Sequence, residues 1–145
     1  MPSLTELASY LESIAPAQIA ESWDNVGVLV RCAQEVTGVL CALDITPATV
    51  REARAVGCNA IVSHHPVIFR PLKELRQGDV PALLVREGVS AVCMHTNLDK
   101  AQGGVNDVLA QALGLRDTEP FAGGIGRVGA LPETMEAAAF AQFVG

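Results

Sequence analysis

Three short apolar runs constrain the fold of this chain more than any other feature. They span residues 37–44, 59–63 and 90–94. Nearly continuous apolar runs of this length are typical of parallel strands that helices cover on both faces, whereas half-exposed strands alternate apolar and polar residues. Stretches with helical spacing separate the runs, and the strand–helix order favours right-handed crossovers. We therefore expect an α/β fold with a largely parallel sheet and helices on both faces.

Start and stop signals mark the helices between these strands. A Ser-x-x-Glu capping box begins at Ser3, ahead of an amphipathic helix that ends before Pro16. Thr46 is a good N-cap with Pro47 at the first helical position, and Gly57 has the place of a C′ glycine. The same reasoning predicts a further strand over residues 26–30 and further helices over residues 80–86, 105–113 and 133–144.

Composition restricts the kinds of partner. The net charge is −6 and no Lys/Arg cluster is present, which argues against nucleic-acid binding. No segment reaches the ~18 apolar residues of a membrane span, and no basic and apolar leader begins the chain. The four cysteines form no Cys-x-x-Cys pair, so buried free thiols are expected. We expect a soluble cytoplasmic protein without a membrane segment.

All three histidines of the chain stand at the ends of apolar runs. His64 and His65 follow the second run directly, and His95 follows the third. Asp44 and Asp99 also lie at or just beyond predicted strand ends. Ligands of open parallel sheets bind at this edge, and imidazoles with a carboxylate are standard ligands of Zn, Fe or Mn. The sequence therefore predicts a divalent-metal site.

The adjacent histidines favour a site with two metal ions. Successive side chains of an extended chain point to opposite sides, so His64 and His65 are expected to face different ions. Asp99 would then bridge the ions or cap one of them. Three ligands are too few for two ions, so further ligands would come from other sequence, a partner chain or water.

Several residues near the predicted site have a plainer interpretation. A His-His pair is often a surface or hydrogen-bonded core pair. Asp44 either caps the helix after it or has a polar role in the pocket. Asp24 and Asn25 are interpreted as turn formers, and Trp23 as a packing residue rather than a stacking surface.

Two sequence features suggest anion binding. Arg70 and Lys73 could contact phosphate, although solvated loop charges are the more common case. Residues 124–129 match the Gly-x-Gly-x-x-Gly dinucleotide fingerprint, but turn residues precede them and Pro132 separates them from the next helix. A dinucleotide-binding fold is therefore not expected.

Two domains are predicted. Residues 1–116 form an α/β metal-site domain. Residues 117–145 form a glycine-rich linker and the start of a second half that is missing from the sequence.

Four motifs, in order along the chain, resemble those of the GTP cyclohydrolase 1 type 2 homologue family, also called NIF-three-like. They are Glu21-Ser-Trp-Asp-Asn-Val-Gly27, Cys41-Ala-Leu-Asp-Ile-Thr46, Ser63-His-His-Pro-Val-Ile-Phe-Arg-Pro-Leu-Lys73 and His95-Thr-Asn-Leu-Asp99. The resemblance implies the N-terminal domain of that α/β fold, with two divalent ions per subunit and a homohexameric toroid. By motif it implies His64, His65 and Asp99 as metal ligands and His95 as an acid–base catalytic residue. The family completes its site with a His-x-x-x-Glu pair, which this sequence does not contain.

The resemblance implies a metal-dependent hydrolase that opens the imidazole ring of GTP. A phosphoesterase or nucleotidase acting on a small phosphorylated substrate is the first alternative. A non-catalytic metal-binding protein that recruits partners is the second.

Overall fold

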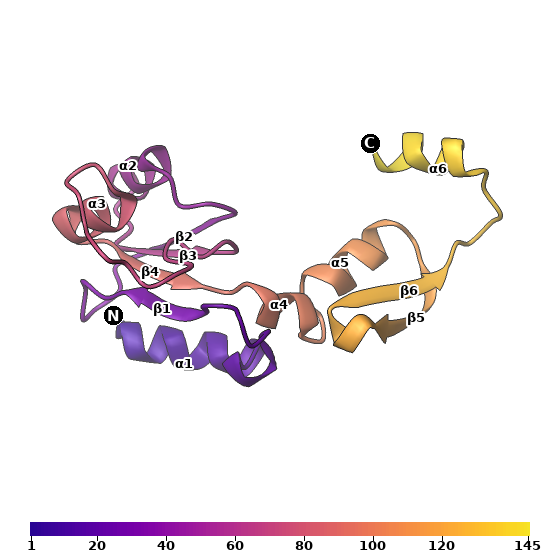
Figure 1. Ribbon diagram of the computed structural model, residues 1–145, viewed down its shortest axis with the longest axis horizontal. Coiled ribbons are helices and arrows are strands. Elements are labelled where there is room, and N and C mark those ends of the chain that lie inside the picture. The colour runs from indigo at the N-terminus through magenta and orange to yellow at the C-terminus, as the bar shows by residue number, and fades with distance from the viewer. The chain divides into compact units, whose positions relative to one another are not determined.

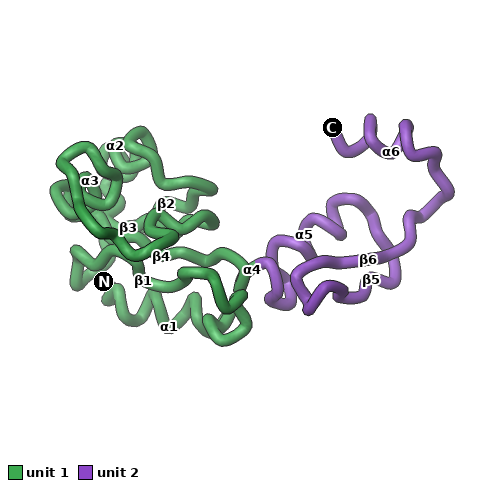
Figure 2. The backbone as a smooth tube through the Cα atoms, in the orientation of Figure 1, with its two compact units in different colours: residues 1–98 green, residues 99–145 purple.

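The computed structural model describes all of residues 1–145 and divides them into two compact units. Unit 1 is Met1–Leu98 and unit 2 is Asp99–Gly145 (Figure 2). The predicted domain boundary after residue 116 falls within unit 2 and stays a prediction. None of the helices is long and apolar enough to cross a membrane.

A four-stranded sheet with the strand order β1-β4-β3-β2 forms the centre of unit 1 (Figure 1). β2 (Val39–Ala42), β3 (Ala60–Ser63) and β4 (Ser90–Cys93) run parallel, as their apolar runs predict. β1 (Gly27–Val30) pairs with the other side of β4 and is antiparallel to it. The expectation of a largely parallel sheet is confirmed, with β1 as the exception.

Helices cover both faces of this sheet, also as predicted. α1 (Leu4–Ile14) lies on one face, and α2 (Pro47–Ala55) and α3 (Val80–Glu87) lie on the other (Figure 1). Because side chains alternate along a strand, β3 contributes to two cores. Ile61 belongs to the core of α2 and α3, whereas Val62 packs with that of α1.

The predicted helix caps form in the structure. Ser3 Oγ accepts a hydrogen bond from the Glu6 backbone N–H at 3.1 Å, and Glu6 Oε2 accepts from the Ser3 N–H at 2.7 Å. Thr46 Oγ1 accepts from the Thr49 N–H at 3.1 Å. Gly88 ends α3 with φ +67°, a left-handed conformation that glycine adopts without strain. Local sequence therefore determines where these helices begin and end.

The antiparallel direction of β1 decides what lies at the functional edge of the sheet. The parallel strands end together, since Ser63 pairs with both Ala42 and Cys93. β1 begins at this same edge, because Gly27 pairs with Cys93. The residues just before β1 therefore lie beside those that follow β4.

Unit 2 combines the helices α5 (Val105–Ala112) and α6 (Ala137–Val144) with a two-stranded antiparallel sheet. α5 contacts β6, and Arg127 on β6 forms an ion pair with Asp107 on α5. The elements of this unit are α5 (Val105–Ala112), β5 (Arg116–Phe121), η2 (Ala122–Gly124), β6 (Gly126–Ala130) and α6 (Ala137–Val144). The remaining short elements of the chain are η1 (Ala17–Ile19) and α4 (Thr96–Lys100).

Residues 117–145, which the sequence predicts as a linker and the start of a second half, include most of the β5–β6 hairpin of unit 2. The sequence of β5 has no alternation of apolar and polar residues that would indicate a strand, and every residue of β5 is exposed in the structure. Pro120 lies within it, which an edge strand of a two-stranded sheet tolerates. The Gly-x-Gly-x-x-Gly sequence runs through β6 rather than through a strand-to-helix turn, as expected. The predicted final helix begins at Ala137, four residues later than Glu133.

We predict that Leu84→Ala lowers the free energy of unfolding by about 2–5 kcal/mol, because the residue is fully buried and its truncation leaves a cavity. Val85→Ala is the matched control, since Val85 is the next residue of α3 and is 60% exposed. Urea unfolding of both variants measures the difference. Equal losses in the two variants would contradict the described packing of α3.

Candidate metal centre

The three histidines of the chain lie together at the carboxyl edge of the unit 1 sheet. The ring centroids of His64 and His95 are 5.1 Å apart, those of His64 and His65 5.2 Å, and those of His65 and His95 5.8 Å. One nitrogen from each ring lies within 4.8 Å of the others. The structure thus assembles an imidazole cluster, by which we mean His64, His65 and His95.

The adjacent rings of His64 and His65 face the same centre, so the expectation that they point to opposite sides is wrong. In a regular strand, successive N–H groups point to opposite edges. Here the His64 N–H donates to the Ala42 carbonyl at 3.1 Å and the His65 N–H donates to the Leu43 carbonyl at 2.9 Å. Both donors bond to the same neighbouring segment, because the chain bends directly after β3.

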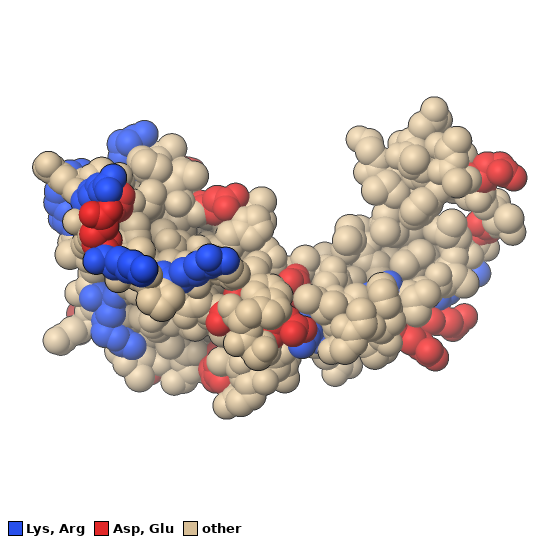
Figure 3. Space-filling view, viewed as in Figure 1, with Lys and Arg blue, Asp and Glu red and all other residues tan.

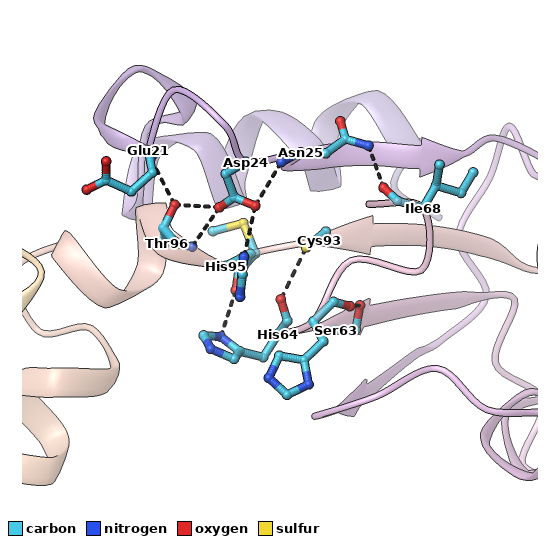
Figure 4. Close-up of polar contacts among 11 residues, drawn as sticks. Glu21, Asp24, Asn25, Ser63, His64, Ile68, Cys93, His95 and Thr96 are labelled. Carbon is cyan, nitrogen blue, oxygen red and sulfur yellow. Dashed lines mark hydrogen bonds and ion pairs between the residues drawn. The ribbon is translucent and has the colours of Figure 1, made fainter. Parts of the chain in front are cut away.

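Asp24 holds His95 in place. Its carboxylate accepts from His95 Nδ1 at 2.9 Å and from the Thr96 backbone N–H at 3.0 Å, and it also accepts from the Thr96 hydroxyl (Figure 4). The Asn25 backbone N–H donates to the same group at 2.8 Å. The Asp24 side chain is fully buried, so its charge is compensated by these donors rather than by water. Asp24 is therefore a positioning residue and more than a turn former.

Opposing effects act on the Asp24 carboxyl. Burial raises its pKa, but hydrogen bonds from Thr96, His95 and Asn25 outweigh burial and hold the pKa below its usual value. The group is therefore an anion at neutral pH, and it can only accept from His95 Nδ1.

The other two rings are also held through Nδ1. His65 Nδ1 lies 2.7 Å from Asp44 Oδ1, and His64 Nδ1 lies 3.1 Å from the Met94 carbonyl oxygen. A carbonyl and an ionised carboxylate are acceptors only, so each Nδ1 carries the proton. In the neutral form of each ring the lone pair is then on Nε2, which is the tautomer that binds a metal through Nε2.

The hydrogen bonds of Thr46 and Asp44 distinguish the two possible roles of Asp44, which are a cap of α2 and a polar residue of the pocket. Thr46, not Asp44, supplies the side-chain cap of α2. The Asp44 carboxylate bonds to His65 instead. Of the two interpretations of the sequence, the polar role in the pocket is the one that the structure favours.

Cys93 supports the backbone of the cluster. Its Sγ donates to the His64 carbonyl oxygen at 3.2 Å. Burial, with a smaller effect of the Asp24 charge, raises the pKa of the Cys93 thiol to about 12. The group is thus a protonated donor at neutral pH. Cys93 is a buried free thiol as expected, whereas Cys41 is exposed.

Asp99 lies in α4, a short helix that the sequence did not indicate. The helix begins directly after His95, whose carbonyl accepts from the Leu98 N–H at 2.9 Å. Asp99 is the first residue of unit 2, whereas the imidazole cluster belongs to unit 1. Its role as a metal ligand stays a prediction.

A cavity of about 420 Å³ lies beside the cluster on the His65 side. Its wall includes both His65 and Asp44, together with apolar side chains of the segment that follows β3. Pockets for small molecules commonly measure about 300–1,000 Å³. The cluster therefore has room for a small ligand next to it.

Comparison with known proteins places this site in a family context. A sequence model of Duf34/NIF3 (NGG1p interacting factor 3) matches residues 2–145. A GTP cyclohydrolase 1 type 2 homolog of Staphylococcus aureus (strain MRSA252) is 43% identical over 118 residues, which cover 79% of this chain and 32% of the relative. The chain spans about a third of the length of the curated relatives it matches.

Solved structures show the same fold. A Bacillus cereus protein related to NIF3 superposes with a TM-score of 0.78 at 39% identity, over 83% of this chain and 35% of that protein. Reduced HcgD from Methanocaldococcus jannaschii superposes with a TM-score of 0.85 at 26% identity, over 99% of this chain and 58% of that protein.

We predict that the neutral forms of all three rings carry their proton on Nδ1, because each Nδ1 faces an acceptor. Long-range ¹H–¹⁵N NMR of the imidazole nitrogens measures this, and the chain has no other histidine to confuse the spectrum. Asp24→Asn should change the tautomer of His95 alone, and Asp44→Asn that of His65 alone. A proton on Nε2 of His95 in the unchanged protein would contradict the described geometry.

Proposed function

This chain belongs to the Duf34/NIF3 family. We propose that it binds divalent metal ions and that it acts as a metal-dependent hydrolase that opens the imidazole ring of GTP. The observation that carries the metal site is the imidazole cluster. One nitrogen of each ring lies within 4.8 Å of the others, and Nδ1 of each ring lies within hydrogen-bond distance of an acceptor.

The chemistry of this donor set fits a divalent cation. Three imidazole nitrogens within 4.8 Å of one another are close enough to coordinate one ion. Imidazole nitrogens bind Zn²⁺ at about 2.0–2.1 Å and also suit Fe and Mn sites. The carboxylates of Asp24 and Asp44, bonded to the far side of their rings, increase ligand basicity.

The number of ions is part of the proposal. The cluster supplies three nitrogens, and Asp99 is proposed as a further ligand. Two ions about 3.5–4 Å apart would need more donors than these four residues provide. We propose that residues of the longer family proteins, or of a second copy in a homohexamer, supply them.

His95 has two candidate roles that use the same atom. As a third ligand, its Nε2 donates a lone pair to the ion. As the predicted acid–base residue, its Nε2 would exchange a proton with the substrate. Its position within the cluster supports the ligand role, and the metal measurement below separates the two.

The proposed reaction uses the residues of the chain in distinct ways. His64, His65 and His95 would hold a divalent ion, and the chemistry it would supply is Lewis-acid activation of water at neutral pH. Asp24 and Asp44 hold the rings of His95 and His65 in one orientation throughout. The cavity beside His65 is proposed to receive the substrate. The name of the Staphylococcus aureus relative, GTP cyclohydrolase 1 type 2 homolog, supports GTP as the substrate class.

We predict that the purified protein binds Zn²⁺ or another divalent ion, and that His64→Ala, His65→Ala and His95→Ala each weaken binding. Loss of a hydrogen-bond partner of a ligand typically lowers affinity about 10- to 100-fold, so loss of a ligand should exceed that range. Competition with a chromophoric chelator measures the affinities, and elemental analysis gives the stoichiometry.

Asp79→Asn is the matched control, because Asp79 is a carboxylate of the same cavity outside the cluster. Unchanged affinity in His95→Ala with loss in the other two would assign His95 to the acid–base role. Unchanged affinity in all three variants would contradict the metal site.

We predict release of formate when the metal-loaded protein is incubated with GTP, since ring opening removes the carbon between the two imidazole nitrogens. The 43% identical Staphylococcus aureus relative is assayed in parallel because it is longer than this chain. Formate from neither protein would contradict ring opening. Inorganic phosphate in place of formate would assign the site to a phosphoesterase.

A further inference from the structure

Two aromatic side chains lie exposed next to the imidazole cluster. Trp23 is 57% exposed and Phe69 is 43% exposed. Their ring centroids are 6.0 Å apart with an interplanar angle of 59°. The chain has only six aromatic residues (one Trp, one Tyr and four Phe), so this pair contains a third of them. We call Trp23 and Phe69 the aromatic pair.

The aromatic pair is held by a hydrogen-bonded framework. Trp23 precedes Asp24, whose buried carboxylate is fixed by four donors. Phe69 follows Ile68, whose carbonyl accepts a hydrogen bond from Asn25 Nδ2 (Figure 4). The turn before β1 is thus bonded to the segment after β3, and each of these segments presents one ring to solvent.

The aromatic pair adjoins the candidate metal centre directly. The Trp23 and His95 ring centroids are 6.4 Å apart, in an edge-to-face arrangement at 77°. A flat ring that packed on the pair would therefore lie on the side of the site that borders His95.

Packing within the protein does not account for Trp23. The sequence favours an interpretation of Trp23 as a packing residue, but more than half of its side chain is in contact with solvent. Large aromatic side chains gain most of their stabilisation from burial, so an exposed pair beside a polar cluster is a feature that a ligand can use. Bases stack on such rings because every base has a π face.

Positive charge lies in the same segment as Phe69. Arg70 and Lys73 are exposed, and neither takes part in an ion pair. On the face drawn in Figure 3, Lys and Arg side chains of unit 1 gather over α2, α3 and the segment between β3 and α3. A protein with net charge −6 thus carries cations on the segment that presents Phe69, where phosphate groups would be attracted.

We propose that the aromatic pair is a stacking subsite for the purine ring of a nucleotide, and that the nucleotide's phosphates face Arg70 and Lys73. The identification of this nucleotide as the substrate rests on the proposed function. The subsite deepens that function, because it names the residues that hold the base while the imidazole cluster holds the metal.

Tryptophan fluorescence tests this subsite, because Trp23 is the only tryptophan of the chain. The indole is excited at the red edge of its absorption band, where Tyr10 does not contribute, and GMP is titrated into the metal-free and the Zn²⁺-loaded chain. We expect saturable quenching by GMP and guanosine, and none by ribose 5-phosphate or pyrophosphate. Free N-acetyltryptophanamide, titrated in the same way, corrects for light absorbed by the nucleotide.

Variants then locate the binding. Phe69→Ala should weaken GMP binding about 5- to 150-fold, the range that loss of one base–aromatic stack produces. Leu75→Ala is the matched control, since it is an exposed apolar residue of the same segment outside the pair. Arg70→Ala combined with Lys73→Ala should weaken GMP but not guanosine.

The outcomes distinguish failure of the subsite from failure of the proposed function. Zn²⁺ binding without quenching by GMP would overturn the subsite and leave the metal site intact. Quenching by GMP in a protein that binds no divalent ion in the chelator competition would support the subsite and contradict the metal-dependent function. If acrylamide does not quench Trp23 in the free protein, another part of the protein covers the ring, and the subsite is overturned.

Discussion

The candidate site depends on one constraint, which is that each imidazole is bonded through Nδ1 to an acceptor from a different part of unit 1. Asp24 comes from the turn before β1, Asp44 follows β2, and the Met94 carbonyl follows β4. Because each acceptor fixes both the tautomer and the direction of its ring, the three Nε2 atoms have little freedom to turn away. The site is therefore formed by the fold before any ligand arrives, and binding would require little reorganisation.

Sheet topology explains why these acceptors are available. The parallel strands β2, β3 and β4 end at one edge, which places Asp44, His64 and His95 there. β1 begins at the same edge because it runs in the opposite direction, and so the Trp23–Asn25 turn lies against the start of α4. This one turn serves two purposes. Asp24 orients an imidazole, and its neighbours hold the aromatic pair beside it.

Much of this arrangement could be predicted from the sequence, and the failures have physical causes. Apolar runs and caps predicted the parallel strands and the helices on both faces, because those signals are local. The positions of His64, His65 and His95 at strand ends predicted that they would be close.

Strand periodicity predicted the wrong directions for the His64 and His65 side chains. The chain bends after β3, and both backbone N–H groups donate to the segment that follows β2. Asp24 was missed because its partners are more than 70 residues away. If the strand at residues 26–30 is placed antiparallel to its neighbour, the turn that carries Asp24 is expected at the same sheet edge as His95. That placement would have been the signal for the role of Asp24. The β5–β6 hairpin was missed because its exposed residues have no apolar alternation.

The most direct test of the account is the coordination of a bound ion, measured by X-ray absorption at the zinc edge of the Zn²⁺-loaded protein. The account predicts nitrogen or oxygen ligands at about 2.0–2.1 Å with the multiple scattering of several imidazoles and no sulfur shell. Sulfur ligands at about 2.3 Å, or a first shell without imidazole, would show that the ion is held elsewhere and would contradict a site built on His64, His65 and His95.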